Sequence, residues 1–185
     1  VGVPPLVIKP EMVENLHREG GTFLGSSRGP QDPKEMVDFL ERERISILFA
    51  IGGDGTQRGA LDIAHEIERR KLLISVIGIP KTIDNDISFV ERSFGFKTAV
   101  SIAKEVLMTG HEEARGAYNG VAVVKLMGRH SGFIAAMAAV ANGDANYVLI
   151  PEVPFELDGD RGFLNILRKR LEERKHALVV VAEGA

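Results

Sequence analysis

Apolar and polar residues alternate along this chain with two different periods, which predicts strands followed by helices. A short, isoleucine-rich run at 45–51 is expected to form a strand buried on both faces. Apolar residues at helical spacing then predict an amphipathic helix over 56–71. The run 73–79 supplies a second strand, which Pro80 is expected to end because proline cannot donate to a ladder. Strand, helix and strand predict a right-handed βαβ unit with parallel strands.

The same alternation continues on both sides of this unit. Before it, an acidic cap, a proline and Glu35 predict a helix over 33–44, while weaker patterns predict a helix from Pro10 to about Gly20 and a strand over 22–25. The elements expected after it are a helix over about 93–109, a loop or helix end over 110–119, a strand over 121–126, a buried helix over 133–141, a strand over 147–150, a helix from 163 to 171 and a strand over 177–182.

These elements predict an α/β fold with Rossmann-like, doubly wound and mostly parallel sheets. A length of 185 residues suits one domain or a domain and a half with an ample core. We expect two α/β lobes, residues 1–96 and 97–185. The chain opens at Val1 without an initiator methionine and stops at Ala185 just after a strand, so we expect both lobes to be incomplete.

The composition of the chain excludes several classes of binding partner and of active site. The net charge of −3 predicts no attraction to nucleic acid or to a membrane surface. The absence of cysteine excludes disulfides, thiolate catalysis and cysteine-type zinc sites. The longest apolar run, 133–141, is too short to cross a bilayer. We expect a cytoplasmic location, with an organellar one left open.

Two acidic loops follow the first two predicted strands. Gly52, Gly53 and Gly55 offer backbone N–H groups at a helix start, which suits a phosphate. Asp54 is an anion itself, so it is expected to reach the phosphates through Mg²⁺. In the second loop Asp84 and Asp86 stand two residues apart, where one carboxylate can hold metal while the other accepts a proton.

A helix cap and turn residues would explain either acidic loop alone. Two such loops after successive parallel strands lie at the sheet edge where α/β proteins bind ligands, and this favours a site. Three more polar residues follow predicted strands: Arg28, Arg129 and Glu183. Each of these residues either binds a ligand or has an ordinary surface role. The histidines show no metal-ligand spacing, and no Walker motif occurs.

Three motifs in this order strongly resemble the phosphofructokinase family: GGDGTQRGA at 52–60, PKTIDND at 80–86 and MGR at 127–129. The strings at 25–28, 93–96 and 150–152 are similar to the plant and trypanosome ATP-dependent branch. The resemblance implies transfer of the γ-phosphoryl group of MgATP to the 1-hydroxyl of fructose 6-phosphate in glycolysis, giving fructose 1,6-bisphosphate and ADP. It further implies a cytoplasmic homo-oligomer, dimer or tetramer, with Mg²⁺ as cofactor.

The resemblance also assigns roles. Asp84 would accept the hydroxyl proton, Thr82 would lie near the moving phosphoryl group, and Asp86 near the metal or the sugar. Asp54 would hold Mg²⁺. The residues expected at the nucleotide phosphates are Arg28, Gly53, Gly55, Thr56 and Gly59. The residues expected at the sugar phosphate, besides those of the second loop, are Met127, Gly128, Arg129 and Glu183, with Arg129 also counted as catalytic. The lobe 1–96 would bind nucleotide and the lobe 97–185 sugar phosphate.

The phosphoryl donor depends on two positions in the resemblance. Gly55 leaves room for ATP where pyrophosphate users typically carry Asp, whereas Lys81 is the residue found in pyrophosphate users. The pair matches the plant and trypanosome ATP type, so ATP is favoured and pyrophosphate is the alternative. The family's N-terminal glycine-rich loop and C-terminal sugar contacts are absent from this sequence, so a non-catalytic fragment or regulatory chain is a further alternative. Lipid and NAD kinases share the first motif but lack the second.

Overall fold

The computed structural model describes residues 5–26, 29 and 31–185. Contacts divide the chain into two compact units, residues 1–32 and 33–185. The first unit contains the single helical turn α1 (Pro10–Val13) and the 3₁₀ turn η1 (Leu16–Arg18), and neither buries a residue. The helix expected up to Gly20 is therefore two separate turns. The strand expected over 22–25 is wrong: the chain turns there, with Gly25 N–H donating to the Thr22 carbonyl at 3.2 Å.

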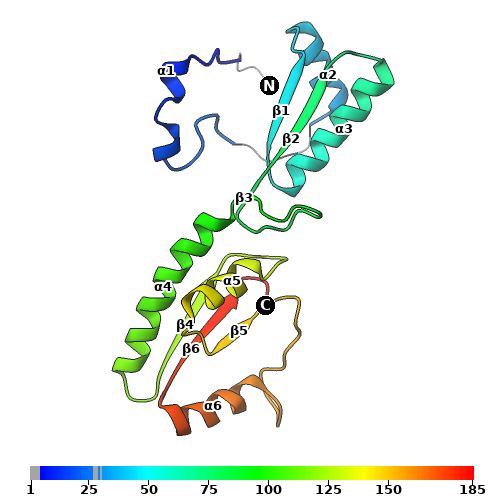
Figure 1. Ribbon diagram of the computed structural model, residues 1–185. Coiled ribbons are helices and arrows are strands. Elements are labelled where there is room, and N and C mark those ends of the chain that lie inside the picture. The colour runs from blue at the N-terminus through cyan, green and yellow to red at the C-terminus, as the bar shows by residue number, and fades with distance from the viewer. Residues whose placement is uncertain (1–4, 27–28, 30) are drawn as a thin grey trace. The chain divides into compact units, whose positions relative to one another are not determined.

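The second unit begins with a parallel sheet and two helices (Figure 1). Its elements in chain order are α2 (Pro33–Arg42), β1 (Ile47–Gly52), α3 (Asp54–Arg70), β2 (Ser75–Thr82) and β3 (Phe94–Gly95). The strand order is β1-β2-β3 and both pairings are parallel, which confirms the βαβ unit expected from the sequence.

Strand β2 does not end at Pro80 as expected. It continues to Thr82, and Pro80 pairs with Gly52, the last residue of β1. Proline has no backbone N–H to donate. Because Pro80 stands in the last pair of the β1–β2 ladder, its missing N–H interrupts no later pairing with β1. Beyond it, Lys81 and Thr82 pair with β3 on the other side, so the strand keeps a partner.

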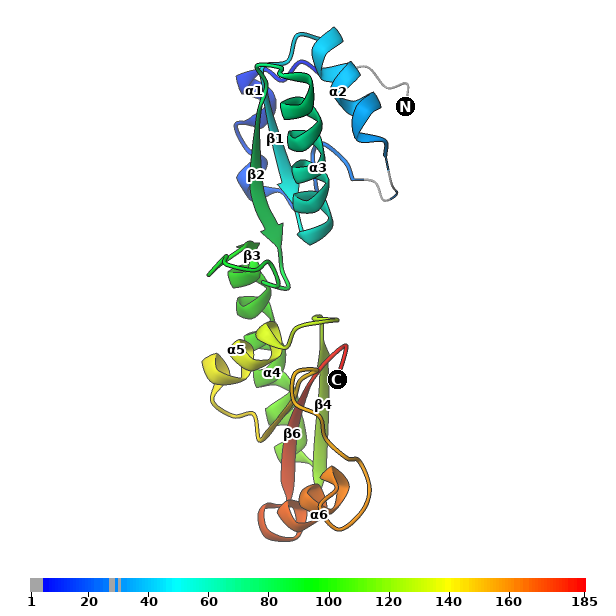
Figure 2. The ribbon, with the colours of Figure 1, turned by 90° about the vertical axis from the view of Figure 1, so that its right-hand side faces the viewer.

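Strand β1 is buried on one face only, which contradicts the expectation of burial on both. The helices α2 and α3 pack on the face that carries Leu48 and Val76 (Figure 2). On the opposite face Ile47, Phe49 and Ile51 are 52, 57 and 53% exposed. The composition of the strand is right for two buried faces, but among the described residues only one face is covered.

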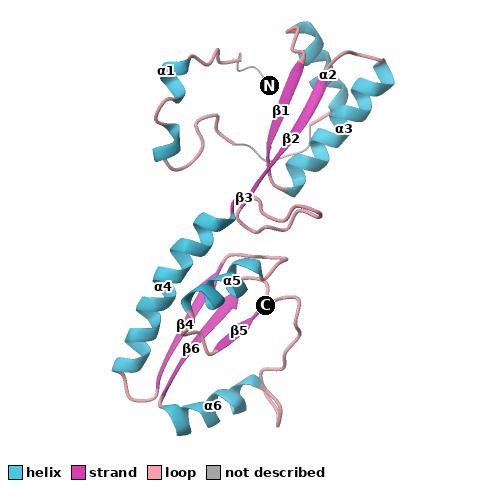
Figure 3. Cartoon of the chain, viewed as in Figure 1, coloured by secondary structure: helices cyan, strands magenta, loops and turns pink. Residues whose placement is uncertain are grey.

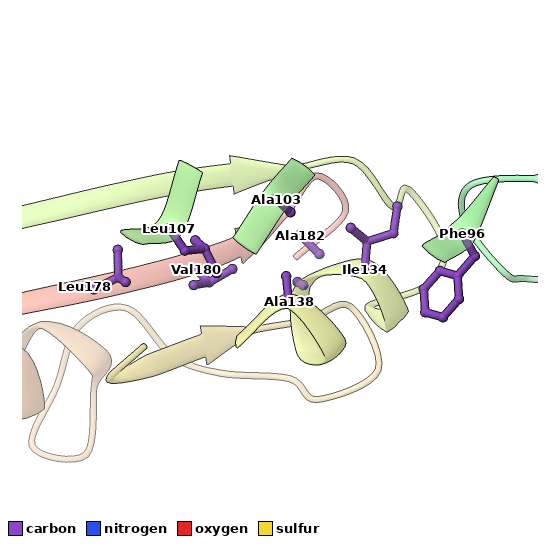
Figure 4. Packing of buried hydrophobic residues seen from close by; sticks show 9 residues of the cluster. Phe96, Ala103, Leu107, Ile134, Ala138, Leu178, Val180 and Ala182 are labelled. Carbon is purple, nitrogen blue, oxygen red and sulfur yellow. The ribbon is translucent and has the colours of Figure 1, made fainter. Parts of the chain in front are cut away.

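The rest of the unit forms a second parallel sheet in the order β4-β6-β5, with three helices around it (Figure 3). Its elements in chain order are α4 (Phe96–Gly116), β4 (Gly120–Leu126), α5 (Phe133–Asn142), β5 (Tyr147–Leu149), α6 (Phe163–Arg174) and β6 (His176–Ala182). The central strand β6 packs Leu178 and Val180 against Leu107 of α4 and Ala138 of α5 (Figure 4).

Helix α4 confirms the second of the two expectations for 110–119, a helix end, whereas helix α5 differs from its expected burial. Most of the polar segment 110–119 belongs to α4, which runs to Gly116 and buries Ala114. Helix α5 is not buried all round: Phe133, Met137 and Val140 are 48, 46 and 78% exposed. No helix in residues 5–26, 29 or 31–185 combines the length and the apolar composition of a membrane span. The α/β class with parallel sheets is confirmed, whereas the two-lobe division of function stays a prediction.

Candidate active site

Two loops leave the first sheet at the carboxyl ends of β1 and β2. We call residues 52–55 the glycine loop and residues 83–93 the aspartate loop. The parallel register pairs Gly52 with Pro80, so both loops start from the same edge of the sheet. They also lie close together, because a Cβ placed on Gly53 would be 3.6 Å from the Cβ of Thr82. The structure therefore brings the two acidic motifs to one place.

The glycine loop turns tightly into α3. Gly53 is the N-cap, and its carbonyl accepts hydrogen bonds from the N–H groups of Thr56 and Gln57, both at 3.0 Å. The Thr56 side chain packs directly against Gly52, where a Cβ would collide with it. Glycine is thus required at position 52 by close packing. The turn aims the start of α3, with the positive end of its dipole, at the sheet edge.

Gln57 ties the end of β1 to the neighbouring part of β2, a role that the sequence did not reveal. Its Nε2 donates to the carbonyls of Gly52 and Ile79, both at 3.0 Å. Its Oε1 fills the space beside Gly78 in which a Cβ would stand. One amide group therefore fixes the end of β1 relative to β2, and with it the start of the glycine loop.

Asp54 is the first residue of α3, and its side chain is 48% exposed. It forms an ion pair with Arg58 one turn later, with 2.9 Å between Nη2 and Oδ2. Within the part of the chain that the structure describes, no three His, Cys, Asp or Glu side chains form a ready-made metal site. Mg²⁺ is commonly held by one or two carboxylates together with substrate phosphates and waters, so an exposed Asp54 at a glycine-rich helix start fits this ion.

Asp84 stands in an unusual environment for a carboxylate. Its N–H donates to Thr82 Oγ1 at 3.1 Å, which holds its main chain, whereas its Oδ1 is buried without a hydrogen-bond partner among the described residues. Burial raises the pKa of Asp84, the charges of Asp86 and Glu183 raise it further, and His130 opposes them. Such a group takes up a proton more readily than an exposed aspartate does.

The second sheet presents a matching edge. Glu183 N–H donates to the Leu126 carbonyl at 2.9 Å, and Gly184 N–H donates to the Gly128 carbonyl at 3.2 Å. The residues after β4 and after β6 are therefore side by side. Gly128 has a φ of +120° and no room for a Cβ, because the Ser131 carbonyl occupies that space. Met127 is 59% exposed, so it is available to a ligand and is not core.

One hydrogen bond joins the aspartate loop to the loop after β4. Ser131 is 4% exposed, and its Oγ donates to the main-chain carbonyl of Asp84 at 2.9 Å. The loop after β4 makes a second hydrogen bond, because Gly132 N–H donates to Glu152 Oε1 at 2.7 Å. This bond, together with the effect of Glu183 and His130 on the pKa of Asp84, brings the aspartate loop close to the residues that follow β4 and β6.

Other candidates have fewer contacts. Gly55 and Gly59 have open space within 4 Å of their Cβ positions, as far as the chain is described, so packing does not require glycine at either. Lys81, Asp86 and Arg129 are exposed, which leaves their proposed roles without direct structural support. Arg28 lies outside the described residues.

Sequence reasoning gave no role to Gln57, Asn85, Ser93, Ser131 or Glu152. All five form hydrogen bonds with the main chain at these loops. Only Asn85 carried a local signal, since asparagine between two aspartates is typical of a turn.

Comparison with known proteins shows which family this chain resembles. The family model described as Phosphofructokinase matches residues 5–185. An "ATP-dependent 6-phosphofructokinase" from Borreliella burgdorferi is 52% identical over 188 residues, covering 98% of this chain and 42% of that protein. One from Trypanosoma brucei brucei is 56% identical over 172 residues, covering 93% of this chain and 35% of that protein.

The solved structures that resemble this chain are also phosphofructokinases. A pyrophosphate-dependent phosphofructokinase from Marinobacter aquaeolei superposes with a TM-score of 0.79 at 26% identity, covering 96% of this chain and 46% of that one. Pichia pastoris phosphofructokinase in the T-state gives a TM-score of 0.75 at 26% identity, covering 90% of this chain and 19% of that one. The chain spans between a third and a half of the length of the curated relatives described above.

Proposed function

Because this chain belongs to the phosphofructokinase family, we propose that the protein transfers the γ-phosphoryl group of MgATP to the 1-hydroxyl of fructose 6-phosphate. The observation that carries the proposal is the environment of Asp84, a carboxylate with a buried, unpartnered oxygen and a raised pKa between two ligand-side sheet edges. Phosphoryl transfer needs little covalent chemistry from the protein, so positioning and charge neutralisation supply most of the catalysis.

Asp84 accepts the proton of the attacking hydroxyl. Its buried Oδ1 supports this role, because this oxygen has no hydrogen-bond partner among the described residues and can therefore accept the proton. Thr82 holds the Asp84 main chain through its Oγ1 and lies beside Gly53, so it stands between the nucleotide side and the sugar side. Asp86 raises the pKa of Asp84 and lies near the metal or the sugar.

The nucleotide side is the glycine loop with the first turn of α3. Gly53, Gly55, Thr56 and Gly59 line the phosphates. Arg28, which lies outside the described residues, is a further nucleotide contact implied by the family resemblance. Asp54 holds Mg²⁺, which neutralises phosphate charge when it is bound. The ion pair between Asp54 and Arg58 orients this carboxylate at the helix start, where it would be a ligand for Mg²⁺. Residues 1–96 form the nucleotide-binding lobe in this proposal.

The sugar side is the edge of the second sheet, in the lobe formed by residues 97–185. Met127, Gly128 and Arg129 contact the sugar phosphate together with Glu183. The adjacency of the chain after β4 and after β6, through the Gly184-to-Gly128 hydrogen bond, supports their joint action. Arg129 supplies positive charge to the phosphate, and it takes part in catalysis by fixing the sugar in place.

ATP is the donor in this proposal. Gly55 has open space around its Cβ position, which leaves room for the rest of the nucleotide. Lys81 and the similarity to a pyrophosphate-dependent structure make pyrophosphate the second candidate. The relatives that are 52% and 56% identical to this chain over 188 and 172 aligned residues are named as ATP-dependent, which supports ATP.

A coupled assay of the whole protein with fructose 6-phosphate and either ATP or pyrophosphate tests the proposal. Fructose 1,6-bisphosphate formed with ATP and not with pyrophosphate is the expected result. Formation with pyrophosphate alone would reverse the assignment of the donor, and binding of sugar phosphate without turnover would indicate a regulatory chain. Light scattering of the same sample tests the expected dimer or tetramer.

A further inference from the structure

The aspartate loop is closed by two buried polar side chains outside the proposed catalytic set. Asn85 is 9% exposed and Ser93 is 6% exposed. Asn85 Nδ2 donates to the Glu91 carbonyl at 3.1 Å, and Asn85 Oδ1 accepts from Ser93 N–H at 2.8 Å. Asn85 and Ser93 stand eight residues apart, so their hydrogen bonds close the loop on itself. We call this pair of residues the Asn85–Ser93 clamp.

Ser93 also connects the clamp to the sheet. Its Oγ is 2.7 Å from the Thr82 carbonyl and 3.1 Å from Asn85 Oδ1. A hydroxyl has one hydrogen, so its main donation goes to the nearer carbonyl of Thr82. The end of β2 and the end of the aspartate loop are thereby held together, on either side of Asp84.

The backbone of Asn85 gives the clamp a second function. Its φ is +56°, in the left-handed region, which asparagine and glycine adopt more readily than other residues. This conformation sets the direction in which the chain leaves Asp84. The main chain of Asp84 is further fixed by Thr82 at its N–H and by Ser131 at its carbonyl.

We propose that Asn85 and Ser93 are positioning residues for phosphoryl transfer, which hold the Asp84 main chain so that its carboxylate stays aimed at the attacking hydroxyl. The inference rests on the proposed function. The clamp holds the main chain on both sides of Asp84 but makes no bond to its carboxylate, so that the carboxylate remains available for proton transfer. A base displaced by about 1 Å is expected to lose on the order of a hundredfold in rate.

Two variants of the whole protein separate the parts of the clamp. Asn85→Gly keeps a residue that adopts positive φ but removes every side-chain bond of Asn85. Ser93→Ala removes the bond to Thr82 and keeps the Ser93 N–H. The matched control is Ser101→Ala on the exposed surface of α4.

The assay measures kcat and KM with ATP and fructose 6-phosphate, and the fraction of chains that bind fructose 6-phosphate. We expect kcat to fall about ten- to a hundredfold in both clamp variants, while KM changes less than about threefold and nearly all chains still bind sugar. Ser101→Ala should match the unaltered protein. A purely structural role would instead lower the fraction of binding-competent chains, with a normal rate per bound chain.

Amide hydrogen exchange supplies a readout that is independent of activity. The Ser93 amide is expected to exchange faster in Asn85→Gly, because its acceptor is gone. Unaltered kcat in both variants of an active protein would overturn this inference alone. If the unmodified protein shows no turnover, the proposed function is overturned. Faster exchange of the Ser93 amide in Asn85→Gly would in that case still support the clamp. Unchanged exchange at Ser93 would overturn the clamp itself.

Discussion

Gly78 lies within β2, and it offers a sharp test of how the sheet edge is held. A Cβ at this position would collide with Gln57 Oε1. That oxygen is at the end of a flexible side chain, so it can move away without displacing backbone. The movement, however, takes with it the Nε2 that joins Gly52 at the end of β1 to Ile79 in β2. Gly78→Ala is therefore expected to destabilise the protein through Gln57.

The magnitude follows from two opposing terms. Gln57 makes two main-chain hydrogen bonds of 3.0 Å, and a typical net value of about 0.5–1.5 kcal/mol each gives a loss of about 1–3 kcal/mol. Replacing a glycine inside a strand by alanine returns about 0.5–1 kcal/mol. The expected change is a net loss of about 0–2.5 kcal/mol in the free energy of unfolding.

Urea unfolding of Gly78→Ala, Gln57→Ala and the double variant measures these terms as a double-mutant cycle. In the Gln57→Ala background the substitution at 78 should be neutral or stabilising, because no side chain remains to be displaced. Strictly additive losses, or a stabilising effect of Gly78→Ala in the unaltered protein, would show that Gly78→Ala does not act through Gln57. In steady-state kinetics, Gly78→Ala and Gln57→Ala should each show a lower affinity for nucleotide. Both disturb the hydrogen bond of Gln57 to Gly52, where the glycine loop starts.

Three further substitutions test separate parts of the structure. Gly55→Asp should weaken use of ATP through crowding and charge repulsion, and unchanged ATP kinetics would contradict the assignment of the donor. Leu178→Ala, in the fully buried centre of β6, should cost about 2–5 kcal/mol of unfolding free energy by thermal or urea denaturation, and a loss below about 1 kcal/mol would argue against this core. Hydrogen bonds from Arg69 and Arg70 lower the pKa of Glu66 from 4.5 to about 2. Because the folded value is the lower one, Glu66 contributes stability above pH 4.5 that is lost as the pH falls towards 2. Glu66→Gln should flatten this acid dependence, and an unchanged slope would exclude the role.

The sequence was informative wherever local pattern and structure coincide. The helical spacing after Gly55 and the apolar runs on either side predicted the βαβ unit and its parallel strands, and the cap before α2 predicted that helix, because these elements depend on period and on caps. The same pattern placed Asp54 and Asp84 after neighbouring strands. The register of Gly52 with Pro80 shows that both loops leave one edge.

What the sequence did not provide depends on contacts between distant residues. Pro80 does not end its strand, because β3 supplies a partner on the other side. The exposed face of β1 has the composition of a buried one, and composition alone does not reveal which faces are covered. Gln57 and Ser131 bond to main-chain groups 22 and 47 residues away, so no local motif predicts them.

The most direct test of the proposed active site is turnover in the whole protein carrying Asp84→Ser, with Asp62→Ser on the exposed surface of α3 as the matched control. Loss of the general base is expected to lower kcat by about 10²–10⁴, while fructose 6-phosphate binds with nearly unaltered affinity and the control stays normal. Near-normal turnover in Asp84→Ser would contradict the role of Asp84 as the proton acceptor.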